Sequence, residues 1–163
     1  VALILLSRGV PWVVPFFYYH RLKAEDTERL FKLDPVISMQ TFPHNPEWVT
    51  AHFTVGAMNL INRDNFYKAG GYDERFINWG FNDFQFQCAV DTLCGPYQRL
   101  NGIIYHLWHP APKKDTVSNP HYADNQKLIK RYREAYGNCE AMRQLISEGK
   151  GESTCLEPTP EMT

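Results

Sequence analysis

The alternation of apolar and polar positions predicts a succession of short helices and strands along the chain. Residues 1–7 form an apolar run that Gly9 ends, which is typical of the end of a helix. Residues 12–17 follow as a continuous apolar run, which favours a short buried strand. The charged segment 24–33 indicates a surface helix. Gly56 then separates two further strand-like runs.

A clear helical pattern begins at Asn82 and extends to about Leu93. Apolar residues recur there at i, i+3, i+4 and i+7, which predicts one buried face made of Phe86, Ala89, Val90 and Leu93. Asn82 is a favoured N-cap, and Gln85 three residues later completes a capping-box pattern. Asp83 then falls in the first turn, where the helix dipole favours an ionised carboxylate.

The dipeptide Asn101-Gly102 is a strong signal for a type I′ turn, so residues 98–100 and 103–108 are expected to form a hairpin. His106 lies in its second strand, and His109 follows directly after it. On a strand these two side chains would point to opposite faces.

Further along, Asn119-Pro120 predicts the start of a helix that continues to about Tyr136. A shorter helix follows Cys139. From about Gly149 the chain is rich in Gly, Glu, Ser, Thr and Pro, which predicts disorder. The expected organisation is one domain over 1–148 and a tail over 149–163.

Composition narrows the possible functions. The chain has 163 residues, 44% of them hydrophobic, enough for one domain with a core. Its net charge of −1 gives no electrostatic reason to bind nucleic acid. The apolar N-terminal stretch is too interrupted for a membrane span. Its 4 cysteines lack C-x-x-C spacing, which favours a buried thiol at Cys88 and the reducing cytoplasm, with a Cys94–Cys139 pair as the alternative.

Candidate chemistry is concentrated in residues 70–84. Glycines at 70, 71 and 80 allow backbone conformations that other residues resist, and aromatic residues surround a few polar groups. An ionised Asp83 beside Trp79 is a candidate general base. The alternative interpretation is a well-capped helix that follows an aromatic turn.

These motifs together resemble the C-terminal half of GT-A glycosyltransferases of the galactosyltransferase and polypeptide N-acetylgalactosaminyltransferase types. The resemblance covers about residues 50–112 and rests on an ordered series: Gly56-Ala57-Met58-Asn59-Leu60-Ile61-Asn62-Arg63, Gly70-Gly71-Tyr72-Asp73-Glu74 and Trp79-Gly80-Phe81-Asn82-Asp83. It implies an α/β fold, namely a partial GT-A (nucleotide-diphospho-sugar transferase) fold with a mixed sheet flanked by helices. It also implies transfer of a sugar from a nucleotide-sugar donor, a UDP-sugar, to an acceptor hydroxyl of a carbohydrate or glycoconjugate.

Individual roles follow from the resemblance. Asp83 falls at the position of the base that deprotonates the acceptor hydroxyl. Trp79 and Gly80 match the Trp-Gly pair that lines the sugar site, and Asn82 stands where the family usually has Glu. An Asn can still hydrogen-bond a sugar hydroxyl. The implied substrate-binding set is completed by Gly56 and Asp73.

The resembling enzymes bind a divalent cation, usually Mn²⁺, through a His after the helix that carries the base. The galactosyltransferase pattern, in which a Lys-Lys loop follows the His, matches His109 with Lys113 and Lys114. The N-acetylgalactosaminyltransferase pattern matches His106. His109 is the preferred metal ligand and His106 the alternative.

The family's Asp-x-Asp motif, which binds metal and nucleotide, does not occur in this sequence. Three interpretations follow: the C-terminal part of a longer enzyme, one half whose partner is a separate chain, or a GT-A remnant that binds carbohydrate or a partner without chemistry. A metal hydrolase built from His106, His109, His121 and Asp83 is a further class, but its ligands lack the His-x-x-x-His spacing of common zinc hydrolases.

Overall fold

The structure is a computed structural model that describes residues 1–33, 48–51, 54–78, 80–110 and 119–150. Its helices are α1 (Ala2–Ser7), α2 (Ala24–Phe31), α3 (Arg63–Lys68), α4 (Asn82–Leu93), α5 (Tyr122–Glu134) and α6 (Cys139–Lys150). Its strands are β1 (Trp12–Val14), β2 (Tyr18–Arg21), β3 (Trp48–Ala51), β4 (Leu60–Ile61), β5 (Gln98–Arg99) and β6 (Ile103–His106). All but the first residues of the predicted tail lie outside the described ranges.

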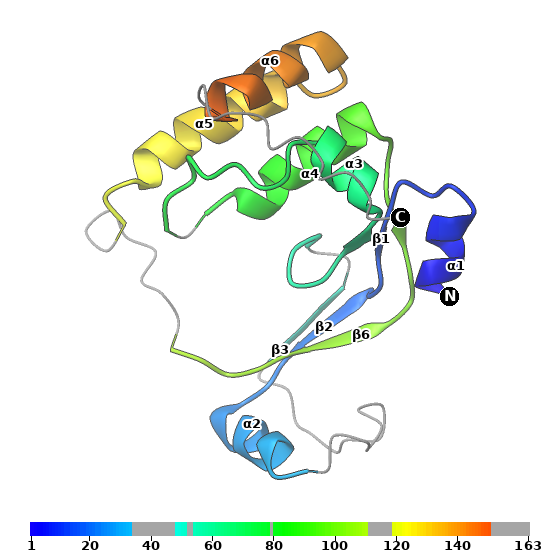
Figure 1. Cartoon of the computed structure of the whole chain (residues 1–163). Helices are drawn as coiled ribbons and strands as arrows, with labels where there is room; N and C mark the ends of the chain where they lie inside the picture. The colour runs from blue at the N-terminus through cyan, green and yellow to red at the C-terminus, as the bar shows by residue number, and fades with distance from the viewer. Residues whose placement is uncertain (34–47, 52–53, 79, 111–118, 151–163) are drawn as a thin grey trace, which may run out of the picture.

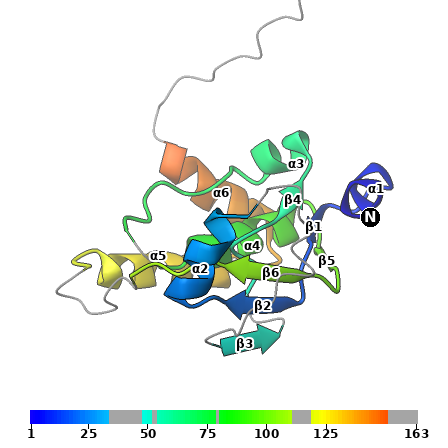
Figure 2. The same ribbon diagram turned by 90° about the horizontal axis from the view of Figure 1, so that it is seen from below.

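Two small mixed sheets have the same arrangement of strands. Strand β1 lies between β4, its antiparallel partner, and β5, its parallel partner. Strand β2 lies in the same way between the antiparallel β3 and the parallel β6. Figure 2 shows β3, β2 and β6 side by side. At this level the expected α/β class, with mixed sheets flanked by helices, is confirmed (Figure 1).

The predicted hairpin at Asn101-Gly102 is wrong, because its two strands belong to different sheets. The carbonyl of Gly102 accepts hydrogen bonds from the backbone N–H groups of Phe17 and Tyr18, at 2.8 and 3.0 Å. A Cβ at Gly102 would overlap the carbonyl of Pro15. Glycine is therefore needed here for the close approach of two chain segments and not for a tight turn.

Trp12 joins the first sheet to helix α4. Its side chain is fully buried, and Nε1 donates a hydrogen bond to Oδ1 of Asp91 at 2.9 Å. Its ring meets Phe86 and Tyr97 edge-on, with centroids 5.8 and 5.0 Å apart. The α4 face expected to be buried is buried at all four positions, which confirms the periodicity: Phe86, Ala89, Val90 and Leu93.

Helix α4 begins at Asn82 as predicted, but the predicted capping box is wrong. Phe81 is the N-cap, its φ of 71° is left-handed, and its side chain makes no capping hydrogen bond. Gln85 instead accepts a hydrogen bond from the backbone N–H of Asp73 at 3.0 Å, and its Nε2 donates to the carbonyl of Gly71 at 3.4 Å. Because Gln85 is buried, its amide needs partners within the protein, and the backbone of this turn supplies them.

The carboxylate of Asp73 joins the same turn to the two C-terminal helices. Its Oδ2 accepts hydrogen bonds from Arg75 at 2.7 Å and from the Tyr132 hydroxyl of α5 at 2.8 Å. Arg75 also donates to the carbonyl of Leu145 in α6 at 2.8 Å. Burial alone would raise the pKa of Asp73, but the hydrogen bonds from Arg75 and Tyr132 outweigh it and lower that pKa.

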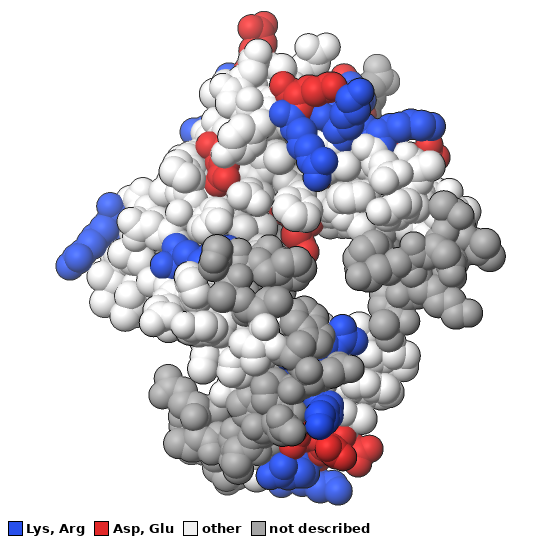
Figure 3. Space-filling view, turned by 180° about the vertical axis from the view of Figure 1, so that it is seen from behind, with Lys and Arg blue, Asp and Glu red and all other residues white. Residues whose placement is uncertain are grey.

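Helices α5 and α6 pack on α4 at one end of the molecule, and α2 lies at the other end (Figure 1). Charged side chains of both signs gather at these two ends (Figure 3). One such pair joins α5 to α6, since Arg131 donates to both carboxylate oxygens of Glu148 at 2.6 and 2.9 Å.

Two expectations from composition can be compared with the structure. Cys88 is buried as predicted, but Cys94 and Cys139 are both free, so the alternative of a disulfide between them is wrong. Within the described ranges, no helix combines the length and the apolar character needed to span a bilayer.

Replacing Tyr132 by Phe removes the hydroxyl bond to a buried carboxylate, so we expect a loss of about 1.5–3 kcal/mol in the free energy of unfolding at pH 7. Urea denaturation measures it. Tyr136→Phe is the matched control, because that hydroxyl lies at 3.4 Å from Asp91 on the surface, and we expect a change within about 0.5 kcal/mol.

The same pair of variants gives a pH test. The folded-state pKa of Asp73 is lowered, so its contribution to stability is present above the unfolded pKa and is lost as the pH falls through the folded pKa. The difference between wild type and Tyr132→Phe should therefore shrink in acid. A difference that stays constant down to complete acid unfolding would contradict the role given to the Asp73 carboxylate.

Candidate functional site

A groove of about 700 Å³ opens between the first turn of α4, the loop before it, the segment 54–57 and the sheet formed by β3, β2 and β6. Five residues named from the sequence line it, although they lie up to 50 positions apart: Gly56, Gly80, Asn82, Asp83 and His106. Trp79 lies outside the described residues. The structure thus brings together the candidate base, its neighbours in the Trp-Gly motif and one of the two candidate metal ligands.

An unusual backbone holds Asp83 at the groove. Three residues just before it have positive φ: Asn78 at 62°, Gly80 at 129° and Phe81 at 71°. For residues other than glycine this conformation costs of order 1–3 kcal/mol and persists only where the surroundings enforce it. Such outliers cluster at ligand sites, so the loop is a candidate functional element in its own right.

Helix α5 supplies the contacts that enforce this loop. The buried Asn125 side chain accepts a hydrogen bond from the backbone N–H of Ile77 at 3.3 Å and donates to its carbonyl at 2.9 Å. The ring of Phe81 lies 5.6 Å from that of Tyr122. The loop is therefore fixed from outside the groove, which leaves its inner side open to a ligand.

The carboxylate of Asp83 lies directly against Gly56. A Cβ built on Gly56 would overlap the carboxyl group of Asp83, so no other residue type fits there without displacing it. Asp83 still has access to solvent through the groove, yet the surrounding protein removes enough water to raise its pKa above the ordinary value for an aspartate. A carboxylate with a raised pKa is a stronger base than an ordinary one.

The two candidate metal ligands are neighbours. Strand β6 ends at His106, so His109 is no longer held on a strand, and the prediction that they point to opposite faces is wrong. Their ring centroids lie 5.0 Å apart and their Nε2 atoms 3.4 Å apart. His109 Nδ1 lies 3.0 Å from the carbonyl of Pro110. Burial lowers the pKa of His106, and the nearby His109 and Arg21 lower it further, which favours the neutral ring that a metal requires.

This spacing fits two ligands of a single ion. Two nitrogen atoms at roughly 2.1 Å from one metal lie about 3.0–3.4 Å apart at octahedral to tetrahedral angles. Within the described ranges, however, no group of three or more His, Cys, Asp or Glu side chains is placed to hold a metal. The four residues considered for a metal hydrolase are thus not gathered as one site, and the histidine pair is an incomplete ligand set.

Several lining residues were not identified from the sequence. Aromatic rings of Tyr19, Phe84 and Tyr105 border the groove, and Thr54 borders it beside Gly56. The Tyr19 ring lies 5.2 Å from that of His106. Burial raises the pKa of Tyr19, with opposing effects from Arg21 and Asp83. Tyr19 lies outside the strands expected from the sequence, whereas Tyr105 lies in the expected strand 103–108 and Phe84 in the candidate stretch 70–84. Which face a strand residue occupies depends on long-range pairing.

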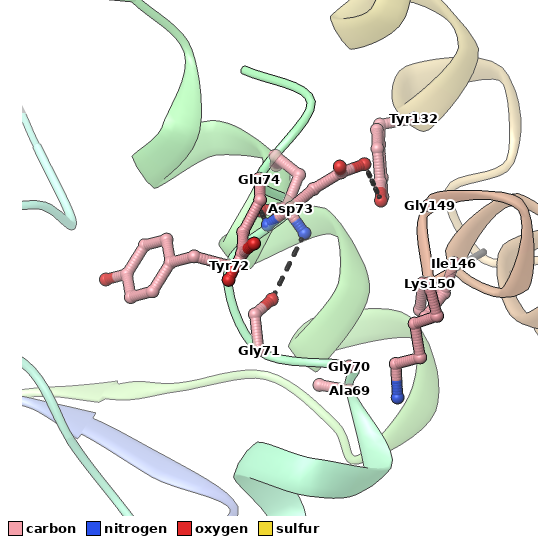
Figure 4. Close-up of a pocket in the computed structure, with 11 residues that line it drawn as sticks. Ala69, Gly70, Gly71, Tyr72, Asp73, Glu74, Tyr132, Ile146, Gly149 and Lys150 are labelled. Atoms are coloured by element: carbon pink, nitrogen blue, oxygen red, sulfur yellow. Dashed lines mark hydrogen bonds between the residues drawn. The ribbon is translucent and has the colours of Figure 1, made fainter. Parts of the chain in front are cut away.

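Asp73 lies elsewhere. It lines a second cavity of about 360 Å³ between the turn before α4 and the helices α5 and α6. Figure 4 shows its carboxylate directed toward Tyr132, while Tyr72 points the opposite way and Lys150 of α6 borders the cavity. The Asp73 carboxylate accepts hydrogen bonds from Arg75 and Tyr132, so Asp73 supports the turn. It is not brought together with Asp83.

Comparison of the chain with protein-family models, with curated proteins and with solved structures finds no match. The geometry of the groove is therefore the basis on which a function can be argued.

Replacing Asp83 by Asn should raise the melting temperature at neutral pH. The folded-state pKa of Asp83 is raised above its unfolded value. The protein therefore loses stability as the pH rises from the unfolded pKa to the folded pKa, and this loss remains at higher pH. The gain of Asp83→Asn should therefore disappear near pH 3. Thermal unfolding from pH 3 to 8 measures it.

The control is Asp64→Asn, at an exposed carboxylate in the first turn of α3, where the helix dipole favours the charge and its removal brings no gain. Equal melting temperatures for wild type and Asp83→Asn at pH 7 would contradict the inferred loss of hydration at the Asp83 carboxylate.

Proposed function

We propose that this chain is the acceptor and catalytic half of a metal-dependent glycosyltransferase with a partial GT-A fold. The reaction moves a sugar from a nucleotide-diphosphate sugar, a UDP-sugar in the resembling enzymes, to an acceptor hydroxyl. The observation that carries the proposal is the position of Asp83, a carboxylate with a raised pKa at the wall of a groove that also contains Gly80, Asn82 and His106.

In this reaction Asp83 takes the proton of the acceptor hydroxyl as that oxygen attacks the sugar carbon. The raised pKa suits this step, because a base is most effective when its pKa approaches the working pH. Asn82 can both donate and accept hydrogen bonds with sugar hydroxyls. The rings of Tyr19 and Phe81 provide apolar surfaces of the kind that ligand grooves use. These groups orient an acceptor with its hydroxyl toward Asp83.

The histidine pair is the part of this chain suited to a divalent cation. His106 and His109 would hold it through their Nε2 atoms, and the ion, when bound, supplies positive charge that stabilises the leaving diphosphate. The described residues do not complete the ligand set, so further ligands would have to come from the donor diphosphate or from residues that the structure does not describe.

A second candidate function is a GT-A remnant that binds carbohydrate or a partner without chemistry. The incomplete ligand set favours it, and so does Asn82 in the position where the resembling enzymes usually have Glu. Both candidates use the same groove, so both are expected to bind an acceptor sugar. Only transfer of a sugar from the donor distinguishes them.

The deciding experiment compares wild type, Asp83→Asn and the control Asp64→Asn, each reconstituted with the donor-binding half that the proposal requires. Release of UDP from UDP-sugars with Mn²⁺ and an acceptor sugar measures transfer, and saturation-transfer NMR measures acceptor binding. We expect Asp83→Asn to lower kcat by about 10²–10⁴-fold while acceptor binding is retained. Sugar binding without transfer by the wild type would favour the remnant, and neither binding nor transfer would contradict both candidates.

Metal binding is tested separately by calorimetry with Mn²⁺ and Zn²⁺. If both histidines bind one ion, His106→Ala and His109→Ala should each weaken binding by about tenfold or more. His20→Ala is the matched control, because that imidazole packs on Tyr105, its neighbour on β6, and is not part of the pair. Loss in only one of the two variants would return the assignment to a single histidine.

A further inference from the structure

The part of the groove wall that faces the Asp83 carboxylate is the main chain of Gly56, which carries no side chain. Gly56 is buried, and the space that a Cβ would need is taken by the Asp83 carboxyl group. The side chain of Asp83 therefore rests on the main chain of another segment. The position of the carboxylate then depends on whatever fixes the main chain at Gly56.

Thr54 fixes Gly56 locally. Its Oγ1 accepts a hydrogen bond from the backbone N–H of Gly56 at 2.9 Å, a side-chain turn that sets the chain direction two residues on. Val55 between them is buried in the core. Ala57 follows with a positive φ of 73°, a conformation that needs such constraints to persist.

Arg99 fixes Thr54 from a distant strand. One guanidinium nitrogen donates to the carbonyl of Thr54 at 2.9 Å and the other to the carbonyl of Phe16 at 3.1 Å. The guanidinium also lies over the rings of Phe16 and Tyr97, at 5.6 and 5.2 Å from their centroids. A planar group held at two carbonyls and two rings has little freedom, and lysine cannot reproduce this geometry.

We propose that Arg99 and Thr54 are positioning residues that hold Gly56 against Asp83 and thereby set the place of its carboxylate in the groove. Arg99 holds the carbonyl of Thr54, Thr54 holds the N–H of Gly56, and Gly56 leaves room for the carboxylate. The consequence for catalysis rests on the proposed function, but the positioning itself does not and can be measured without any substrate.

If Arg99 and Thr54 had only a structural role, their variants would give a different result. If Arg99 and Thr54 only attach strand β5 to the segment 54–57, their variants lower stability and leave Asp83 unaffected while the protein is folded. If they position Gly56, their variants release the carboxylate into water, and the Asp83 titration changes in protein that is still folded.

The test is ¹³C NMR titration of wild type and variants labelled at the aspartate carboxyl carbons, with the Asp83 signal assigned by its loss in Asp83→Asn. Because Tyr19 and His106 line the same groove and also titrate, the midpoint is read from the Asp83 carbon itself. We expect Gly56→Ala and Thr54→Val to move the pKa of Asp83 down toward the ordinary value of about 3.9. Thr54→Ser keeps the hydroxyl and should retain the wild-type pKa.

Arg99→Lys, which keeps the charge but not the planar fork, should behave like Thr54→Val. Circular dichroism verifies folding, and if an Arg99 variant fails to fold, the near-isosteric pair Thr54→Val and Thr54→Ser still decides. An unchanged Asp83 pKa in folded Gly56→Ala and Thr54→Val would overturn the proposal. So would an equal change in Thr54→Val and Thr54→Ser.

Activity is measured alongside. If the wild type transfers sugar, Thr54→Val should lower kcat by about tenfold or more, because small displacements of a reacting group are costly, and Thr54→Ser should restore it. If the wild type reconstituted with a donor-binding half transfers no sugar, the proposed function fails, while a shifted Asp83 pKa in the variants still supports the positioning of the carboxylate.

Discussion

The fold depends on one contact between layers, the burial of Trp12 of β1 against α4. The indole is enclosed on its faces and edges, and its single polar group is satisfied by Asp91, so the contact carries large apolar burial without an unpaired donor. Gln85 fixes the other end of the same helix by bonding the turn before it. A rigid helix held at both ends places its first turn accurately, and that first turn carries Asp83.

The loop before α4 shows how stability elsewhere maintains an unfavourable backbone. Positive φ values at Asn78 and Phe81 are sustained by Asn125 and Tyr122 of α5, which lie outside the groove. The contacts that fix this loop are thus made with α5, on the side that faces away from the groove that Asp83 lines.

Local signals in the sequence were enough where local physics decides. The periodicity of α4 predicted its bounds and its buried face, whereas the roles that the motif series gives to Asp83 and its neighbours stay predictions. Predictions failed where a distant partner competes. Gln85 bonds the turn at Asp73 instead of capping its own helix. At Gly102 the lack of a side chain allows close approach to Pro15 and does not serve a tight turn. The histidines are adjacent because the strand ends at His106, a boundary set by pairing with β2. No local pattern contains such information.

The link between Arg75 and α6 has a consequence for synthesis on the ribosome. Arg75 and the carbonyl of Leu145 are separated by 70 residues, so the turn before α4 cannot complete its contacts until most of the described chain has been made. Before α5 and α6 are made, Asp73 has Arg75 beside it but not Tyr132, and α4 lacks its packing against these two helices. Among the described helices, α6 is thus the last to emerge and the one that completes these contacts.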